Sequence, residues 1–551
     1  MKTIIALAFS AMLAAAVAPN PLAAVAQGGR DMSAQVDQIF TRWNSSSTPG
    51  CAVGTSVKGR TALENAYGMA DLEHDVKITP ETIFEAGSVS KQFTAAAVLL
   101  LAREGKLSLD DPVRKYLPEL SDAASAVTIR QMLNHTSGLR DWGSIEAIAG
   151  WPRTSRVYTH AHVLEIVGRQ RALNFPPGTK WSYSNSGYNL AAIIVSRTSG
   201  MPFAEFTRQR LFQPLGMNHT SWRDDHTRVV KDRAIAYANE KDGFHTDMPF
   251  EKVHGNGGLL TTVGDLLKWN ENFTTPTVGD RRFVEEEQQP GHFNDGRTHF
   301  YALGLMVRSS RGVPVVEHSG STAGYQAHLM RYPDQHVSVA VLCNASNATA
   351  SQYAHSVGEL YVADALQKPL TASHTLTAAE MERATGVYRD TSTGMTLSLV
   401  IDRNELRVEH GPSLIASSAT RFATEGGDRF ELAGRELHVA DAYGSVSSYE
   451  RIDPWTPTRD RLQELAGTYA SDEAETTLAV ALDGDTLVAR QRPDTTIKLT
   501  PVYADAFRAP QLGLVIFRRD GTGRVNELSV VQDRVWDLRF ARQQPAKSVS
   551  Q

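Results

Sequence analysis

The last third of the chain repeats itself, and this repeat restricts the fold more than any other feature. Gly386-Val387-Tyr388 matches Gly467-Thr468-Tyr469, and the alternating apolar residues after them also match, each pair 81 positions apart. Residues 441–444 match residues 520–523 at an offset of 79, which indicates that one loop is two residues shorter. Two domains of similar fold are therefore expected. Alternation gives each sheet one apolar face, and closure into a small antiparallel β-barrel would bury it.

The repeat also sets the domain boundaries. A chain of 551 residues is too long for a single hydrophobic core. The pattern changes after Gln367-Lys368-Pro369, and Asp453-Pro454-Trp455-Thr456-Pro457 has the composition of a linker. We predict a large domain over residues 27–370, a first barrel over 371–455 and a second barrel over 456–551.

The first 26 residues have the pattern of a secretory signal peptide. Lys2 is followed by an apolar run and by Ala24-Val25-Ala26, a small-x-small cleavage site. The residue after the expected cut is Gln27 rather than cysteine, so no lipid anchor is indicated. No later run is long and apolar enough to span a membrane. We therefore expect a secreted, periplasmic protein with no transmembrane segment in its mature chain.

Composition excludes some function classes. The net charge is -5, which leaves no large basic field for binding nucleic acid. The two cysteines, Cys51 and Cys343, fall in apolar segments typical of strands, and we expect buried thiols, with a disulfide as the alternative. No ligand spacing indicates a metal site, and no cofactor is expected. A small molecule or a short peptide is the expected partner.

Ser88-Val89-Ser90-Lys91 is the chain's only Ser-x-x-Lys sequence, and it opens an Ala/Leu-rich helix that we expect to stop at Gly105. Residues three apart share one face of a helix, so the amine of Lys91 can reach the hydroxyl of Ser88. A serine hydroxyl is a poor nucleophile until a neighbouring base takes its proton. By itself this short pattern is common, and an ordinary helix start with an incidental lysine is the favoured interpretation.

Tyr183-Ser184-Asn185 follows a strong break at Pro176-Pro177-Gly178. In an extended segment Tyr183 and Asn185 face the same way, so the phenol and the amide would project into one space. A tyrosine can transfer protons, and an asparagine can hydrogen-bond an amide substrate. The rival match at Tyr237-Ala238-Asn239 precedes Asp242-Gly243, a hairpin turn, and is predicted to be an exposed strand end.

His318-Ser319-Gly320 ends an apolar strand that begins near Val313. A strand end of this kind can present backbone N–H groups along an open edge, and such groups stabilise a tetrahedral oxyanion. A histidine that only hydrogen-bonds at a strand end is the simpler interpretation of His318.

The three short sequences, in this order and spacing, resemble the motifs of the serine penicillin-recognising enzymes, in the branch of class C β-lactamases, DD-peptidases and esterases. The resemblance covers roughly residues 36–365. It is supported by residues 132–139, 175–178 and 214–217. It implies an α+β fold in which an antiparallel sheet carries helices on both faces, with an all-helical region beside it and the cleft between. The two C-terminal barrels make the layout similar to that of the D-aminopeptidases, in which a barrel loop restricts the active site.

The resemblance also implies the site residues. Ser88 would be the acylated nucleophile, Lys91 its proton partner and Tyr183 a general acid or base. Asn185, His318 and Gly320 would bind substrate, and the backbone N–H groups of Ser88 and Ser321 would form the oxyanion hole.

His318 departs from the family pattern. Members that act on carboxylate-bearing substrates such as β-lactams usually have lysine at this position, and a neutral imidazole attracts a carboxylate less than a permanent cation does. The His-x-Gly form resembles the D-aminopeptidases and some esterases of the family. We therefore expect an exported serine hydrolase acting on D-amino-acid peptides, amides or small esters. The alternatives are a β-lactamase or DD-carboxypeptidase, and a non-catalytic sensor that keeps the cleft.

Overall fold

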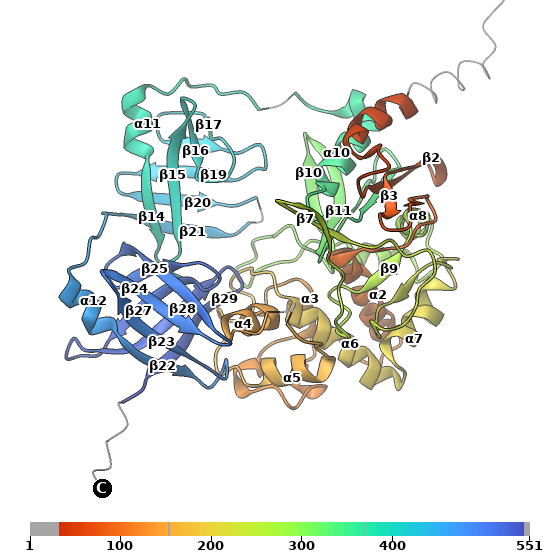
Figure 1. The fold of residues 1–551 in the computed structure, drawn as a ribbon. Coiled ribbons are helices and arrows are strands. Elements are labelled where there is room, and N and C mark those ends of the chain that lie inside the picture. Colours follow the sequence, from red (N-terminus) through yellow and green to blue (C-terminus); the bar gives the residue numbers. More distant parts are fainter. Residues whose placement is uncertain (1–31, 153–154, 369, 443, 545–551) are drawn as a thin grey trace, which may run out of the picture.

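The computed structural model describes residues 32–152, 155–368, 370–442 and 444–544. A large α+β unit forms the right half of Figure 1, and two smaller units built mainly of strands lie on its left. The predicted fold class is confirmed. The predicted signal peptide, residues 1–26, lies outside the described residues. Within the described ranges no helix is both long and apolar enough to cross a membrane.

The large unit is built on a six-stranded antiparallel sheet in the order β10-β11-β12-β13-β1-β2. Its strands are β10 (Met306–Ser310), β11 (Val313–Thr322), β12 (Tyr325–Tyr332), β13 (Val337–Cys343), β1 (Cys51–Val57) and β2 (Arg60–Tyr67). β1 and β13 come from distant parts of the chain, yet Cys51 lies directly opposite Cys343 in the ladder. The two cysteines form a disulfide. Our expectation of buried thiols is wrong, because this strand pairing places the two side chains together.

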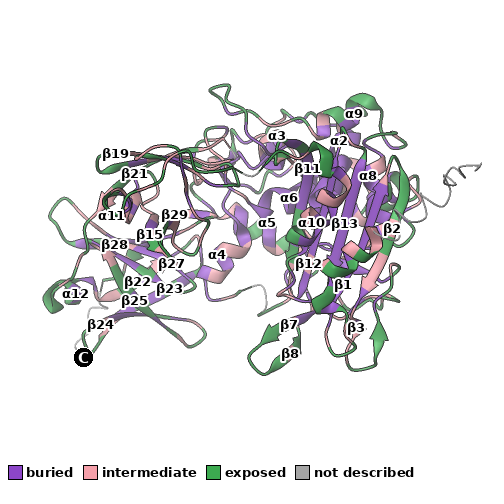
Figure 2. Cartoon of the chain, turned by 90° about the horizontal axis from the view of Figure 1, so that it is seen from above, coloured by how far each residue is buried: buried purple, intermediate pink, exposed green. Residues whose placement is uncertain are grey.

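Each face of the sheet packs against helices. Val53 and Val341 point to the face covered by residues 32–39 and by α10 (Ala350–Val362). Their neighbours Ala52 and Leu342 point to the opposite face, under α8 (Val263–Glu271) and α2 (Ser90–Arg103). Because side chains alternate along each strand, one hydrophobic core forms on each face of the sheet. The central strands are therefore buried along their length (Figure 2).

The all-helical region packs against α2 on the side away from α10. It consists of α3 (Ile129–Leu133), α4 (Trp142–Ile148), α5 (His160–Gly168), α6 (Asn185–Ser199) and α7 (Phe203–Thr207). The first of these helices is capped by Thr128, whose hydroxyl accepts a hydrogen bond from the backbone N–H of Gln131.

Shorter elements connect these layers. They are the helical turns η1 (Thr41–Trp43), η2 (Gly87–Val89), η3 (Val113–Lys115), η4 (Asp122–Ala124), η5 (Arg208–Phe212) and η6 (Ala363–Ala365), the helix α9 (Arg281–Glu287), and the strands β3 (Met69–Asp71), β4 (Val76–Lys77), β5 (Phe84–Glu85), β6 (Ser221–Trp222), β7 (Tyr237–Glu240), β8 (Gly243–Thr246) and β9 (Leu259–Thr261). β7 and β8 form the predicted hairpin.

The repeat appears as two helix-plus-eight-strand units. The first has α11 (Ala378–Ala384) and the open sheet β14 (Gly386–Asp390), β15 (Thr396–Asp402), β16 (Glu405–Val408), β17 (Ile415–Ala416), β18 (Arg421–Ala423), β19 (Arg429–Ala433), β20 (Glu436–Ala440) and β21 (Val446–Ile452). The second has α12 (Arg459–Leu465) and the closed barrel β22 (Gly467–Ser471), β23 (Thr476–Asp483), β24 (Thr486–Gln491), β25 (Thr495–Tyr503), β26 (Ala506–Ala509), β27 (Gly513–Arg519), β28 (Val525–Gln532) and β29 (Val535–Arg542).

Matching contacts recur in the two units. The hydroxyl of Tyr388 donates to the carbonyl of Ala384 at 2.8 Å, and that of Tyr469 donates to the carbonyl of Leu465 at 2.8 Å. In both units a buried tyrosine on the first strand therefore fastens that strand to the last turn of the preceding helix.

The second barrel is docked on the large unit. Thr476 and Arg492 donate to the carbonyl of Ala149 at 3.1 and 2.7 Å, just beyond the end of α4. Its apolar interior is continuous with the core of the large unit. This contact brings the barrel's β28–β29 turn to the site described next.

Candidate active site

Ser88 lies in the helical turn η2, between strand β5 and helix α2. Lys91 follows in the first turn of α2 and is fully buried. Its Nζ atom lies 3.1 Å from the Oγ atom of Ser88, as the spacing predicts. Two further oxygens surround the amine, the side-chain oxygen of Asn185 at 2.9 Å and the backbone carbonyl of Asn256 at 2.7 Å.

Tyr183 and Asn185 enter from the start of α6. Ser184 is extended and α6 begins at Asn185, whose backbone N–H donates to the carboxylate of Asp141 at 2.7 Å. The ring centroid of Tyr183 lies 4.8 Å from Nζ of Lys91. Burial raises the pKa of Tyr183, while a hydrogen bond with Ser88 and the charge of Arg534 oppose that rise. The phenol therefore keeps its proton at neutral pH.

The edge of β11 approaches the turn that carries Ser88. A Cβ atom at Gly320 would lie 2.0 Å from the carbonyl oxygen of Ala86, and one at Gly87 would lie 2.5 Å from the backbone nitrogen of Ser321. Only glycine fits at these two positions. The two glycines thus allow the backbone around Ser321 to lie against that around Ser88.

His318 is buried on β11 and held at both ring nitrogens. Its Nε2 atom lies 2.8 Å from the hydroxyl of Tyr301, and its Nδ1 atom lies 2.6 Å from the carbonyl oxygen of Ser319. Burial, with the nearby charge of Lys91, lowers the pKa of His318 to about 3. The imidazole is therefore uncharged at neutral pH.

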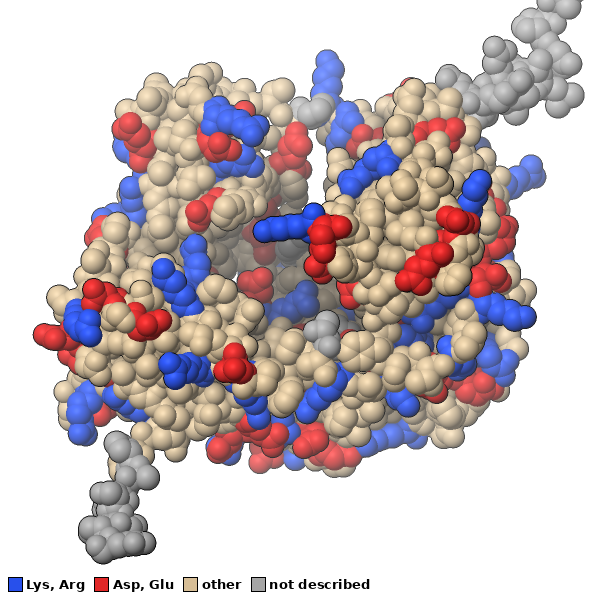
Figure 3. All heavy atoms as spheres, in the orientation of Figure 1, with Lys and Arg blue, Asp and Glu red and all other residues tan. Residues whose placement is uncertain are grey.

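Of the site residues predicted from the sequence, all but the buried Lys91 line one cavity. The cavity has a volume of about 880 Å³, and its lining includes Ser88, Tyr183, Asn185, His318, Gly320 and Ser321. The sequence motifs at residues 88–91, 183–185 and 318–320 thus meet at one place. On the face seen in Figure 3, the molecule is hollowed between the two C-terminal units on the left and the large unit on the right.

Our sequence reasoning assigned no role to His135, although the stretch that contains it supported the resemblance. Its ring packs against that of Tyr183 at a tilt of 37°, with centroids 4.3 Å apart, and its Nδ1 atom accepts a hydrogen bond from the backbone N–H of Ser184 at 3.2 Å. Burial and the charge of Lys91 hold the pKa of His135 well below its usual range. A neutral His135 therefore supports the Tyr183 ring from behind.

Arg534 also belongs to the site, and no sequence signal indicated it. It lies in the β28–β29 turn of the second barrel and lines the cavity, with its guanidinium 4.8 Å from the ring centroid of Tyr183. A loop of a C-terminal barrel thus reaches the cavity, as the similarity to the D-aminopeptidase layout implied.

The turn that carries Arg534 is anchored from the large unit. The buried Arg140 donates to Glu473 at 2.8 Å and to the backbone carbonyls of Trp536 and Asp537 at 3.3 and 3.1 Å. The carbonyl of Arg534 itself accepts from the backbone N–H of Asp141 at 3.2 Å. The main chain of the turn is therefore fixed beside the cavity.

Known proteins are similar to this chain in sequence and in fold. D-aminopeptidases of Brucella ovis and Brucella anthropi are 25% and 26% identical, each over 88% of this chain and 93% of the relative. Among solved structures, the D-amino acid amidase of Ochrobactrum anthropi matches with a TM-score of 0.53 and 22% identity, over 61% of this chain and 99% of the amidase. The octameric penicillin-binding protein homologue of Pyrococcus abyssi matches with a TM-score of 0.53 and 22% identity, over 78% of this chain and all of that one.

The model of the family described as Beta-lactamase matches residues 30–362, which include the six-stranded sheet, the all-helical region and all three motifs. The chain belongs to the beta-lactamase family.

Proposed function

We propose that the protein is an exported serine hydrolase that forms an acyl-enzyme on Ser88 and acts on peptides or amides of D-amino acids. One observation carries the proposal: the hydroxyl of Ser88 lies within hydrogen-bonding reach of the buried amine of Lys91, beside a cavity that Tyr183 also lines. Two of the relatives are D-aminopeptidases and a solved neighbour is a D-amino acid amidase, which supports this substrate class.

Lys91 has the surroundings of a base. To act as a base, the charged ammonium group must first give up a proton; the neutral amine then has two hydrogens and one lone pair. The oxygens of Asn185 and Asn256 can accept the two hydrogens, which leaves the lone pair facing the proton of Ser88. The deprotonated serine oxygen then attacks the substrate carbonyl.

The remaining steps need an oxyanion hole and a proton donor. The backbone N–H groups of Ser88 and Ser321 would stabilise the oxyanion, and their approach across Gly87 and Gly320 supports this role. Tyr183 keeps its proton at neutral pH and would deliver it to the leaving amine, with Lys91 restoring the proton to the phenol. Water then attacks the acyl-enzyme by the reverse path.

Asn185 and His318 would position the substrate. The amide of Asn185 lines the cavity and can hydrogen-bond the amide of a peptide. The uncharged His318 suits a neutral substrate group better than a carboxylate, which supports an amide or peptide substrate over a β-lactam.

Export is supported by the disulfide between Cys51 and Cys343, because such bonds persist in oxidising compartments. Sequencing the N-terminus of protein recovered from a periplasmic fraction tests this part of the proposal. A mature chain beginning at Gln27 is the expected result.

A substrate panel tests the activity. We would assay a D-alanine anilide, its L-enantiomer, a D-Ala-D-Ala peptide, a nitrophenyl ester and a chromogenic cephalosporin. We expect the D-anilide to be preferred and the Ser88→Ala variant to lose at least about a thousandfold in kcat. Preference for the cephalosporin or the D-Ala-D-Ala peptide would favour the β-lactamase or carboxypeptidase alternative instead. If no substrate is turned over, the protein is a binding protein.

A further inference from the structure

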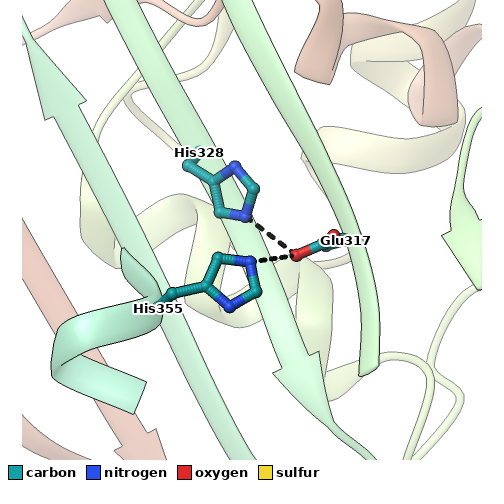
Figure 4. Close-up of side chains that lie close together, drawn as sticks. All are labelled: Glu317, His328 and His355. Atoms are coloured by element: carbon teal, nitrogen blue, oxygen red, sulfur yellow. Dashed lines mark hydrogen bonds and ion pairs between the residues drawn. The ribbon is translucent and has the colours of Figure 1, made fainter. Parts of the chain in front are cut away.

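Three potential metal ligands converge at the wall of the candidate active site. Glu317 comes from β11, His328 from β12 and His355 from α10. Figure 4 shows both imidazoles pointing at the same carboxylate oxygen. The Nε2 atom of His328 lies 3.2 Å from Oε2 of Glu317, and that of His355 lies 2.9 Å from it.

These separations suit a tetrahedral metal ion. Zinc binds histidine nitrogen and carboxylate oxygen at about 2.0–2.2 Å, so two ligands on one tetrahedral ion stand about 3.3–3.6 Å apart. The three ligand atoms here all lie within 4.8 Å of one another. Small side-chain rotations would therefore bring them to the corners of a zinc site. Two histidines and one glutamate are also a ligand set that zinc uses in enzymes.

Two features of the surroundings also suit a metal site: a partner for the second carboxylate oxygen and a route by which an ion can enter. The other oxygen of Glu317 faces the guanidinium of Arg308, whose Nε atom is 3.7 Å away, so the carboxylate has a partner outside the ligand set. His355 also lines the active-site cavity, and its side chain is 29% exposed. An ion can thus enter from the cavity, and its fourth position would face that space.

Two observations weigh against tight binding. Arg308 places a positive charge near the site, and the Nδ1 atom of His328 is buried without a hydrogen-bond partner. An outer partner on a ligating histidine is worth about 10- to 100-fold in metal affinity. The alternative is a purely structural cluster in which the two imidazoles hydrogen-bond a buried carboxylate.

We propose that Glu317, His328 and His355 form a zinc site in the wall of the active-site cavity. Bound zinc would tie α10 to β11 and β12 and would stabilise the folded protein by mass action. The same strand carries His318 and Ser321 one and four residues further on. The ion would therefore stiffen the strand edge that lines the cavity, while the Ser88 chemistry would not need it.

The test is zinc binding by the tag-free full chain after treatment with EDTA and desalting. Competition with a chromogenic chelator should give one equivalent bound, and added zinc should raise the melting temperature. Cobalt at the same site should give the intense visible absorption of a four-coordinate ion. Glu317→Gln, which keeps the shape of the side chain, and His355→Ala should each weaken zinc binding at least about 100-fold.

His245→Ala and Ser88→Ala serve as controls. His245 is an exposed histidine 2.9 Å from Asp242, so its loss should leave zinc binding unchanged. Ser88→Ala should lose hydrolysis and keep zinc, which separates this inference from the proposed function. Wild-type protein that binds no zinc would overturn the proposal. Binding that survives both Glu317→Gln and His355→Ala would also overturn it.

Discussion

At the scale of single residues, the site depends on the partners of one amine. Lys91 is fully buried, and the oxygens of Ser88, Asn185 and Asn256 surround its Nζ atom. The spacing of Ser88 and Lys91 on one helical turn predicted the first of these contacts. The contacts with Asn185 and Asn256 involve residues more than 90 positions away in the chain, so no local sequence pattern could predict them.

The first prediction concerns the phenol of Tyr183. Tyr183→Phe keeps the ring against His135 and removes only the hydroxyl, so the protein should fold while kcat falls about 10²- to 10⁴-fold. Steady-state kinetics on the best substrate of the panel measures the loss. Tyr353→Phe is the control, because Tyr353 lies on α10 outside the cavity, where its hydroxyl accepts a hydrogen bond from the indole N–H of Trp43. A Tyr183→Phe variant with unchanged kcat would exclude a proton-transfer role.

The second prediction concerns the charge at position 318. His318 is uncharged at neutral pH, and His318→Lys would place an ammonium group in the cavity. Activity on carboxylate-terminated substrates should rise relative to neutral ones, about tenfold if an ion pair worth about 1.4 kcal/mol forms in the complex. The measurement is the ratio of kcat/KM for a D-Ala-D-Ala peptide and for its C-terminal amide. An unchanged ratio would contradict our interpretation of His318.

At the scale of elements, the β28–β29 turn connects the second barrel to the site. The turn puts Arg534 in the lining of the cavity, next to Tyr183. The turn is held more rigidly than a free loop, because the two strands that flank it, β28 and β29, are both paired in the closed barrel. A barrel of this kind is therefore suited to restricting which substrates reach Ser88.

The third prediction tests this restriction. Arg534→Ala removes a large side chain from the cavity, so kcat/KM for bulky substrates should rise relative to small ones, by about three- to tenfold. A dipeptide and a longer D-amino-terminated peptide are suitable substrates. Arg524→Ala removes an arginine that is 82% exposed, ahead of strand β28, and should leave the ratio unchanged. Equal ratios in the wild type and Arg534→Ala would show that the turn does not select by size.

At the scale of the whole molecule, polar contacts and a shared core hold the second barrel on the large unit. Arg140 is 2% exposed and pairs with Glu473, which is 12% exposed. Nearby, Arg171 pairs with Asp472, but these side chains are 72% and 81% exposed. Removing one partner of a buried pair leaves an uncompensated charge, whereas an exposed pair is worth little.

The fourth prediction follows from this contrast. Arg140→Ala should destabilise the docked protein by about 3–5 kcal/mol, and Arg171→Ala by about 0–1 kcal/mol. Scanning calorimetry measures both effects, and limited proteolysis should cut Arg140→Ala sooner at the junction. Equal melting temperatures for the two variants would mean that the buried pair does not hold the barrel.

The chain's own patterns determined its organisation. Alternating strands repeated at a fixed offset predicted the two C-terminal units, and three short motifs predicted the family and the residues that line one cavity. The alternation of apolar residues along a strand and the three short motifs each involve residues only a few positions apart. The sequence alone is therefore enough to show them.

Tertiary structure decided the rest. The pairing of β1 with β13 made a disulfide where we expected thiols, and barrel docking brought Arg534 to Tyr183. Adjacent strands and a helix assembled Glu317, His328 and His355, which share no sequence spacing typical of a metal site. Such contacts depend on which strands pair and which surfaces dock, and these choices are made by the burial of whole faces rather than by any local pattern.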